Sequence, residues 1–195
     1  MARFVQSASH PGQLPRVGRA TEVAVVGRSN VGKSSLLGRL LGAPSLVRTS
    51  RTPGRTQLIN LFAMGDDWRF VDLPGYGYAK LSHKARAELA QVLDGYLFRE
   101  HAFDGALCLL DARRGEVTEL DRQMVAQLLQ VGRPVLVVVT KLDLIAKPQQ
   151  RAQLGKVAKS LGLPADWVCG ASSKSGVGLD EIWRRLREIR GGEGD

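Results

Sequence analysis

The feature that most constrains the fold is the alternation of short apolar runs with stretches of helical periodicity along most of the chain. Residues 106–112 (ALCLLDA) and 134–140 (PVLVVVT) are apolar almost without interruption, and the stretch between them has the spacing of an amphipathic helix. Strands that are apolar on both faces are typical of parallel sheets covered by helices on each side. The alternation therefore predicts an α/β protein with a mostly parallel sheet and right-handed crossovers, whose ligands bind beyond the carboxyl ends of the strands.

Six strands and five helices are expected in this alternation. The expected strands span 21–26, 56–64, 67–73, 106–112, 134–140 and 166–172, and the expected helices span 33–41, 83–98, 118–132, 147–162 and 178–190. A Gly-Asp turn at 65–66 joins two of the strands as a hairpin, so one strand of the six-stranded sheet is expected to be antiparallel. In the helix over 118–132, the expected inward face consists of Leu120, Met124 and Leu128.

The length of 195 residues fits one domain of ordinary size. We expect residues 21–191 to form that domain, after an irregular leader over 1–20 and before a loose tail over 192–195. The run over 42–55 is long for a loop inside a compact domain, which is typical of a functional loop or a disordered segment.

Composition bears on the compartment and the partners. No apolar run approaches the roughly 18 residues of a membrane span, and residues 1–16 have no hydrophobic signal core. Cys108 and Cys169 each lie in an apolar run, which favours two buried thiols in a reducing compartment over a disulfide. We therefore expect a cytoplasmic protein with no membrane partner, and we take it to be a monomer. The net charge of +9 and the pI near 10.1 favour a polyanionic partner such as nucleic acid, with a role in solubility as the alternative.

The segment GRSNVGKS, residues 27–34, matches the pattern G-x-x-x-x-G-K-[ST] between an expected strand and an expected helix. Glycines let the backbone turn so that successive N–H groups face phosphate oxygens, and the following helix adds its dipole. Lys33 is expected to reach the β- and γ-phosphates, and the Ser34 hydroxyl is expected to bind Mg²⁺. The pattern predicts a nucleoside triphosphate but does not distinguish ATP from GTP.

The segment DLPG, residues 72–75, ends the second strand of the expected hairpin. A carboxylate at that point is suited to hold the Mg²⁺ shell through water, which is the role we expect for Asp72. The backbone N–H of Gly75 is expected to face the γ-phosphate. The bare pattern D-x-x-G is common at strand ends, and its place about 40 residues after the phosphate loop gives it weight.

The segment TKLD, residues 140–143, ends another buried strand. Asp143 is positioned to accept two hydrogen bonds from the ring N–H and the amine of guanine, a donor pair that adenine lacks, so the segment favours GTP. The stem of Lys141 is expected to cover the base, and a backbone N–H near Ser172 is expected to reach guanine O6. A helix-capping role for Asp143 is the alternative.

Taken together, these motifs resemble those of the translation-factor-related P-loop GTPases, and within them the EngB family. The closer resemblance depends on GRSNVGKSSL, TPGRTQLIN, VDLPGYGYAK and TKLD, and covers roughly residues 20–190. It implies a G-domain fold and a GTPase that assists assembly of the large ribosomal subunit, and through it normal cell division. It also implies that Thr56 is the switch-loop Mg²⁺ ligand, although Thr49 and Thr52 lie in the same loop. Thr140 replaces the more common Asn and thereby removes an amide expected to support the loop.

The resemblance implies a set of nucleotide contacts in five segments. They are Gly27, Arg28, Ser29, Asn30, Val31, Gly32, Lys33, Ser34 and Ser35; Gly54, Arg55, Thr56, Gln57 and Leu58; Asp72, Leu73, Pro74 and Gly75; Thr140, Lys141, Leu142 and Asp143; and Ala171, Ser172 and Ser173.

The expected catalytic element consists of Lys33, Thr56, Gly75 and Asn30. Tyr76 stands where Ras-like GTPases have a Gln, and a phenol does not orient water as an amide does. We therefore expect slow hydrolysis of GTP to GDP that a partner or a cation accelerates. Asn30 either helps bind K⁺, as in related GTPases, or makes a loop hydrogen bond. Arginines that are candidates for an internal finger are Arg28, Arg48, Arg51 and Arg55.

Two basic groups remain. His83, Lys80, Lys84 and Arg86 follow the second switch segment and are expected to contact ribosomal RNA. Arg184, Arg185, Arg187 and Arg190 are expected to form a solvated helix face with neighbouring glutamates. Two other functions stay open: a guanine-nucleotide module without turnover, and a P-loop kinase for a small molecule.

Overall fold

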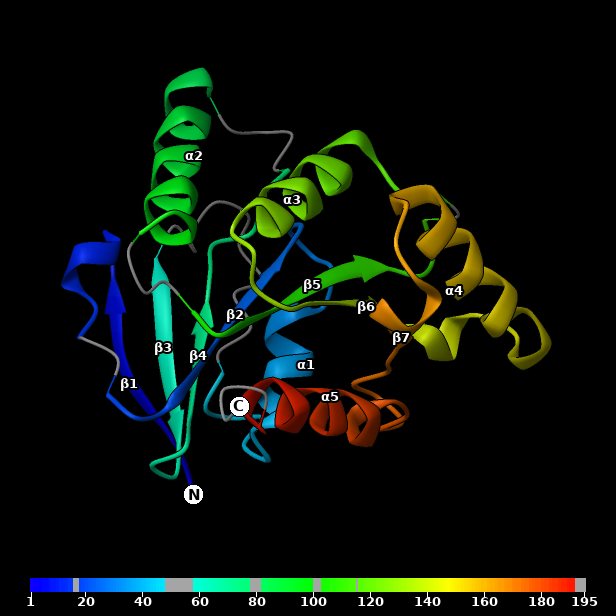
Figure 1. Cartoon of the computed structure of the whole chain (residues 1–195), viewed down its shortest axis with the longest axis horizontal. Coiled ribbons are helices and arrows are strands. Elements are labelled where there is room, and N and C mark those ends of the chain that lie inside the picture. The colour runs from blue at the N-terminus through cyan, green and yellow to red at the C-terminus, as the bar shows by residue number, and fades with distance from the viewer. Residues whose placement is uncertain (16–17, 48–57, 78–81, 100–102, 115, 192–195) are drawn as a thin grey trace.

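The computed structural model describes residues 1–15, 18–47, 58–77, 82–99, 103–114 and 116–191. It contains one twisted sheet with helices on both of its faces (Figure 1). The strands are β1 (Ala2–Ala8), β2 (Thr21–Gly27), β3 (Ile59–Met64), β4 (Trp68–Asp72), β5 (Gly105–Asp111), β6 (Val135–Thr140) and β7 (Val168–Gly170). The helices are α1 (Lys33–Leu40), α2 (His83–Leu97), α3 (Glu119–Gln130), α4 (Lys147–Leu161) and α5 (Leu179–Gly191), with short 3-10 turns η1 (Pro11–Gln13), η2 (Leu142–Leu144) and η3 (Ala165–Trp167).

The sheet is mixed and its strand order is β1-β3-β4-β2-β5-β6-β7. β3 is antiparallel to both of its neighbours, while β4, β2, β5, β6 and β7 pair in parallel. The prediction of one antiparallel strand in a mostly parallel α/β sheet is confirmed. The prediction of six strands is wrong, because the described chain has a seventh, β1.

The additional strand lies in the segment expected to be an irregular leader. β1 pairs with β3 along its length, and the register shifts between Phe4 and Gln6. Phe4 packs edge-on against Phe62 of β3, with ring centroids 5.7 Å apart. The bulge breaks the two-residue alternation by which a strand is identified in a sequence, and the pairing partner lies more than fifty residues away.

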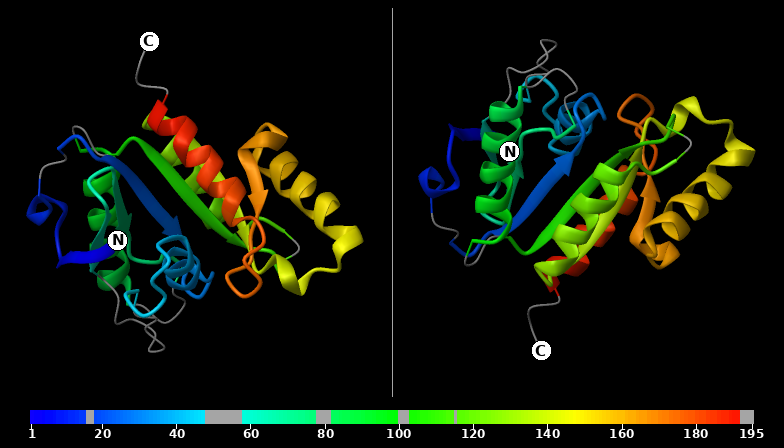
Figure 2. Two further views of the ribbon diagram at one scale, coloured as in Figure 1. Left: turned by 90° about the horizontal axis from the view of Figure 1, so that it is seen from below. Right: turned by 90° about the horizontal axis from the view of Figure 1, so that it is seen from above.

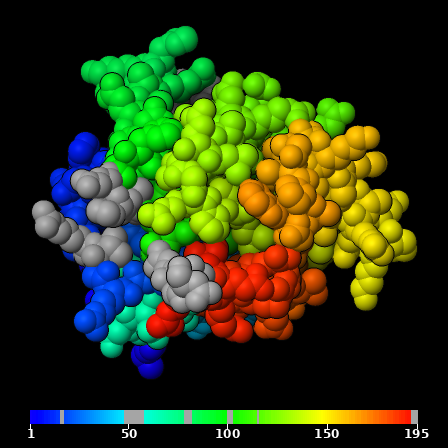
Figure 3. Space-filling view, in the orientation of Figure 1, coloured from blue at the N-terminus to red at the C-terminus, as the bar shows by residue number. Residues whose placement is uncertain are grey.

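The helices divide between the two faces of the sheet. Side chains of α2, α3 and α4 join one buried cluster, and those of α1 and α5 join the other. Figure 2 shows this division from two sides, with α4 at the far end of the sheet beyond the edge strand β7. In the space-filling view α3, α4 and α5 form the surface on the β5–β7 side of the molecule (Figure 3).

The buried face of α3 differs from the expected one. Leu120 is 45% exposed, whereas Asp121, Met124, Val125 and Leu128 are buried. The prediction for Leu120 is therefore wrong. Asp121 is buried in its place because it accepts hydrogen bonds from the hydroxyl of Tyr76, which follows β4, and from that of Thr118, which caps the helix. The inward stripe therefore lies one residue further along the helix than expected.

The two cysteines are buried free thiols, as expected. Burial raises the pKa of each to about 12, so both are uncharged at neutral pH. Of the helices in the described ranges, none is both long and apolar enough to cross a bilayer.

Candidate nucleotide-binding site

The phosphate loop connects the end of β2 to the start of α1. Gly27 is fully enclosed there, since a Cβ on it would lie 2.9 Å from Cγ1 of Val31 and 3.0 Å from the carbonyl oxygen of Leu109. Asn30 and Gly32 both have left-handed backbone conformations, with φ of 63° and 99°. The loop therefore has the tight reversed turns that aim successive N–H groups into its own hollow.

Several of those N–H groups have no partner in the described chain. The first helical hydrogen bond of α1 runs from the N–H of Leu36 to the carbonyl of Gly32, at 2.9 Å, and no side chain caps the helix. Upstream of it, four consecutive N–H groups make no hydrogen bond to any described residue: those of Gly32, Lys33, Ser34 and Ser35. Orphan donors at the positive end of a helix form an anion site, and a phosphate chain fits it.

Lys33 and Asp72 face one another across the same hollow. The parallel register of β2 with β4 sets Asp72 beside Val25, close to where β2 runs into the loop. The ammonium of Lys33 donates to Oδ1 of Asp72, and both side chains are buried. A buried pair of this kind is compensated internally, because each charge neutralises the other.

The donor set suits Mg²⁺ bound together with a nucleotide. Ser34 and Asp72 line a common cavity of about 460 Å³, which also contacts Ser7 and Phe4 of β1. Across the described ranges, no three His, Cys, Asp or Glu side chains gather closely enough to hold a metal by themselves. Mg²⁺ characteristically takes one or two protein oxygens and completes its shell with phosphate oxygens and water. The residues present therefore fit Mg²⁺, which Ser34 and Asp72 would hold.

The D-x-x-G segment packs directly on the phosphate loop. The N–H of Ser29 donates to the carbonyl of Tyr76 at 2.9 Å, and the N–H of Tyr76 donates to the carbonyl of Gly27 at 3.3 Å. A Cβ on Gly75 would lie 3.1 Å from the backbone nitrogen of Ser29, so a side chain there would press on the phosphate loop. Leu73 and Pro74 connect this contact to Asp72, and both are buried.

The Tyr76 side chain points to α3. Its hydroxyl donates to Oδ1 of Asp121 at 3.0 Å, and its ring is buried. Burial, with Cys108 and Asp121 nearby, raises the pKa of Tyr76 far above its usual value, so the phenol stays protonated. Arg28 enters the same cluster by donating to the Thr118 hydroxyl at 2.9 Å. The phosphate loop, the D-x-x-G segment and the start of α3 are thus joined by side chains.

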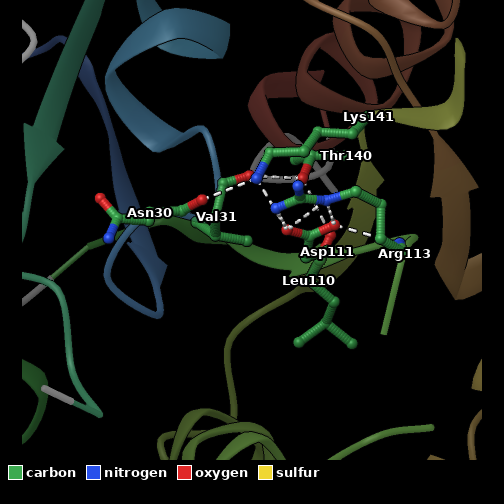
Figure 4. Close-up of polar contacts among 7 residues, drawn as sticks. All are labelled: Asn30, Val31, Leu110, Asp111, Arg113, Thr140 and Lys141. Carbon is green, nitrogen blue, oxygen red and sulfur yellow. Dashed lines mark hydrogen bonds and ion pairs between the residues drawn. The ribbon is translucent and has the colours of Figure 1, made fainter. Parts of the chain in front are cut away.

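Thr140 ties the base end of the site to the phosphate end (Figure 4). Its hydroxyl lies 2.6 Å from the carbonyl oxygen of Val31 and 3.0 Å from that of Leu110, and it is buried. Thr140 lacks the amide of the more common Asn, as expected from the sequence, and its hydroxyl supports the phosphate loop instead. A hydroxyl at the end of β6 reaches the phosphate loop because the strand ends directly beside it.

Lys141 makes a second tie to the same loop. Its ammonium donates to the carbonyl of Asn30 and pairs with Asp111, both at 2.7 Å, and its own backbone is left-handed with φ of 59° (Figure 4). Burial opposes ionisation of Asp111, but hydrogen bonds from Arg113 and Lys141 outweigh it and hold the pKa of that carboxyl well below its usual value. Asp111 is therefore a permanent anion that fixes the lysine.

The part of the site that is expected to hold guanine is arranged around Ser172. The buried Ser172 hydroxyl donates to Oδ1 of Asp143 at 2.5 Å and accepts from the N–H groups of Lys174 and Ser175. The N–H of Ser172 donates to Val177, so it is already engaged. In the described chain the N–H of the next residue, Ser173, has no hydrogen-bond partner.

Leu142 links the loop that follows β6 to the loop that follows β7. Its N–H donates to the carbonyl of Ala171 at 3.1 Å, and the N–H of Ala171 donates to Val139 of β6. Two glycines allow the close fit. A Cβ on Gly170 would lie 2.6 Å from Cδ2 of Leu142, and one on Gly178, whose φ is 82°, would overlap the carbonyl oxygen of Gly170.

Part of the expected set lies outside the described residues. This applies to Arg48, Thr49, Arg51, Thr52, Gly54, Arg55, Thr56, Gln57 and Lys80. Leu58 is described and is 40% exposed just before β3. The other expected contacts lie along one edge of the sheet, at the carboxyl ends of β2, β4, β6 and β7.

Three residues that hold side chains of the site in place were not predicted from the sequence. Asp111, Thr118 and Asp121 hold Lys141, Arg28 and Tyr76 in place. Asp111 carried a detectable signal, since it ends a buried strand at the same edge as the other motifs. Thr118 and Asp121 also form a capping box at the start of α3, a pattern that by itself indicates only a helix start.

Comparison with known proteins identifies the family of this chain. Residues 22–141 match the model of a family described as 50S ribosome-binding GTPase. A probable GTP-binding protein EngB of Desulfatibacillum aliphaticivorans is 41% identical over 188 residues, which is 96% of this chain and 91% of that protein. The chain belongs to the EngB family. A probable EngB of Geobacter sulfurreducens is likewise 41% identical, over 96% of this chain and 90% of its own length.

Solved structures agree with the EngB fold. A crystal structure of a probable GTP-binding protein engB superposes with a TM-score of 0.73 at 24% identity, covering 88% of this chain and all of that one. Era, solved with MgGDPNP and a segment of 16S ribosomal RNA, gives a TM-score of 0.67 at 25% identity. This chain covers 56% of that Era chain and is itself covered to 87%. This EngB is thus a G domain of a GTPase family that uses GTP, GDP and Mg²⁺.

Proposed function

We propose that this EngB hydrolyses GTP as a molecular switch and assists the assembly of the large ribosomal subunit, and through it normal cell division. The observation that carries the proposal is that Thr140 and Lys141, which precede Asp143, are hydrogen-bonded to the phosphate loop. Asp143 is held by Ser172 beside a free N–H, and the phosphate loop offers unpaired amides next to Lys33. A guanine nucleotide matches both ends, and the ribosome-binding description of the family supports the partner.

In the proposed reaction, the chain chiefly binds and orients. The amides of the phosphate loop and Lys33 hold the β- and γ-phosphates, and Asp143 with the N–H of Ser173 holds guanine. Ser34, Asp72 and the proposed Thr56 would hold magnesium, which would supply neutralisation of the charge on the phosphates. Among the described residues the N–H of Gly75 has no hydrogen-bond partner, so it is available for the γ-phosphate in this proposal. Release of that phosphate would let the switch segments relax, which changes the surface offered to a partner.

Intrinsic turnover is proposed to be slow. The Tyr76 hydroxyl is committed to Asp121, so it does not position a water molecule. Among the described residues, the Asn30 side chain has no hydrogen-bond partner, which favours its proposed role in binding K⁺ over a loop hydrogen bond. Single-turnover hydrolysis measured in KCl and in NaCl tests this, and equal rates would remove potassium from the mechanism.

Ribosomal RNA is the proposed partner of the segment after the second switch. His83 and Lys84 are exposed at the start of α2. Arg86 is exposed two residues further along, and Lys80 lies outside the described residues. The chain is proposed to act as a cytoplasmic monomer.

Two experiments test the proposal. Asp143→Asn is expected to shift nucleotide preference from GTP toward xanthosine triphosphate, because the amide no longer accepts both guanine donors. Calorimetry with GTP, XTP and ATP measures it, and comparable affinity of the wild type for ATP would refute guanine recognition. Co-sedimentation with large subunits in GTP, GDP and a non-hydrolysable analogue tests the switch. Single-turnover hydrolysis with and without subunits separates a GTPase from a module that binds GTP without turnover.

A further inference from the structure

Every charged residue on the outward face of helix α4 is cationic. Its charged residues are Lys147, Arg151, Lys156 and Lys159, and all four are exposed. The sequence from residue 144 to residue 165 contains no Asp or Glu. Positive charge is therefore concentrated on this helix, whereas most soluble protein surfaces mix charges of both signs.

The other arginine-rich helix, α5, provides an internal comparison. Arg184 pairs with both Glu181 and Glu188, and Arg185 pairs with the same two carboxylates. Arg190 pairs with Asp67 in the turn between β3 and β4. Most of the positive charge on α5 is thus neutralised within the chain, in agreement with the expected solvated face.

No such neutralisation is present on α4. Within the described ranges, none of its four cations lies within ion-pair distance of a carboxylate. Lys147 and Arg151 are separated by four residues, and Lys156 and Lys159 by three, which brings like charges together on the helix surface. Lys147 also stands in the first turn, where the helix dipole disfavours a cation. Each of these arrangements opposes helix stability and favours an external anion.

The position of α4 leaves this face open. The helix packs through Leu154, Val157, Ala158 and Leu161 against the core cluster it shares with α2 and α3. Its opposite side forms the rim of the molecule beyond β7, as Figures 1 and 3 show in yellow. From Lys147 to Lys159 the helix rises roughly 18 Å, at about 1.5 Å per residue, so the cations span several phosphates of a nucleic acid strand.

We propose that the outward face of α4 is a docking surface for ribosomal RNA, whose phosphates supply the missing negative charge. The inference extends the function proposed above by assigning part of RNA binding to a helix remote from the switch segments. An anionic membrane is less well matched, because an interfacial helix needs a large apolar face to insert. On α4 that face is packed inside the protein, and no large apolar side chain of the helix is exposed in the described chain.

The same helix is joined to the guanine loop. The Gln150 side chain donates to the carbonyl of Leu142 at 3.1 Å and to that of Ile145 at 3.0 Å. Leu142 directly precedes Asp143, so the first turns of α4 and the guanine loop form one unit. RNA bound along α4 would therefore lie against the segment that holds the base.

The test compares two double variants with equal loss of charge. Arg151→Gln with Lys159→Gln removes two cations from α4, and Arg184→Gln with Arg187→Gln removes two from α5. Binding to purified large subunits, and to protein-free RNA extracted from them, is measured between low and moderate salt. Each phosphate contact contributes a slope of about −0.7 to −0.9 in log K against log salt. The α4 variant should therefore lose about 1.5 of that slope and about 30-fold in affinity near 0.1 M salt.

The outcomes separate the inference from the function on which it depends. Wild-type affinity and slope in the α4 variant, or equal losses in both variants, would overturn the docking surface while leaving the proposed function intact. A wild type that hydrolyses GTP but binds neither subunits nor RNA would overturn both. Loss of binding to phosphatidylglycerol vesicles in the α4 variant, with unchanged RNA binding, would assign the face to a membrane instead. Unchanged GDP affinity and thermal unfolding show that each variant is folded.

Discussion

Replacing Thr140 by valine tests whether one hydroxyl holds the phosphate loop against the sheet. Valine preserves the shape of the side chain and suits a buried strand, so the hydroxyl is the only group removed. That group lies within hydrogen-bond distance of two buried carbonyl oxygens, those of Val31 and Leu110. Its single proton satisfies one of them at a time, so the loss is that of one bond rather than two.

The magnitude follows from that count. A buried carbonyl left without a donor costs about 1–3 kcal/mol, and one neutral hydrogen bond contributes about 1 kcal/mol net. We expect Thr140→Val to lower the free energy of unfolding by about 1–2 kcal/mol. If the full contribution of the bond is needed to shape the phosphate loop, GDP affinity should fall about fivefold, since 1.4 kcal/mol corresponds to tenfold.

Urea denaturation without nucleotide and calorimetric titration with GDP measure the two effects. Thr140→Ser is the matched control, because it retains the hydroxyl and loses only a methyl group, worth about 0.8 kcal/mol on burial. Serine should therefore preserve GDP affinity where valine does not. Equal GDP affinity in the wild type and the valine variant would refute the idea that this hydroxyl supports the phosphate loop.

Two further substitutions address the base end. Asp111→Asn should release Lys141 and weaken GDP binding by about threefold to tenfold, the range for loss of one charge-assisted hydrogen bond discounted for solvent. Because the pKa of Asp111 is lower in the folded chain than in the unfolded chain, the unfolded chain takes up a proton first and stability falls as pH drops below about 4; the asparagine variant should flatten that acid limb. Gly178→Ala should destabilise the protein by about 3 kcal/mol in urea, because its Cβ would overlap the carbonyl of Gly170 at a left-handed φ.

Each of these has a result that contradicts it. An acid limb of the same steepness in the Asp111→Asn variant would mean that this carboxylate does not carry the linkage. Wild-type stability of Gly178→Ala would mean that the loop after β7 rearranges freely. Gly155→Ala on α4 is the control for glycine, since a Cβ there meets nothing within 4 Å.

The phosphate loop was predictable because its chemistry is contiguous. Residues 27–34 carry the glycines, the lysine and the serine in one stretch, between a strand and a helix that are each evident from apolar spacing. The ends of the buried strands were predictable for the same reason. β2, β5 and β6 begin or end within one residue of their expected limits.

Contacts between distant segments were not predictable in the same way. β1 depends on β3 for its hydrogen bonds, and its bulge hides the strand pattern. Asp121 is buried because Tyr76, forty-five residues earlier, donates to it. A carboxylate has no reason to be buried until its partner is known, so spacing alone favoured Leu120.

The adjoining ties from Thr140 and Lys141 have a consequence for nucleotide exchange. Both side chains donate to neighbouring carbonyls, those of Val31 and Asn30, and so link the phosphate loop to the segment that precedes Asp143. GDP keeps both ends occupied even after the terminal phosphate has gone. We therefore expect GDP release to involve both ends of the site together, and we expect a factor that speeds release to act where β6 meets the phosphate loop.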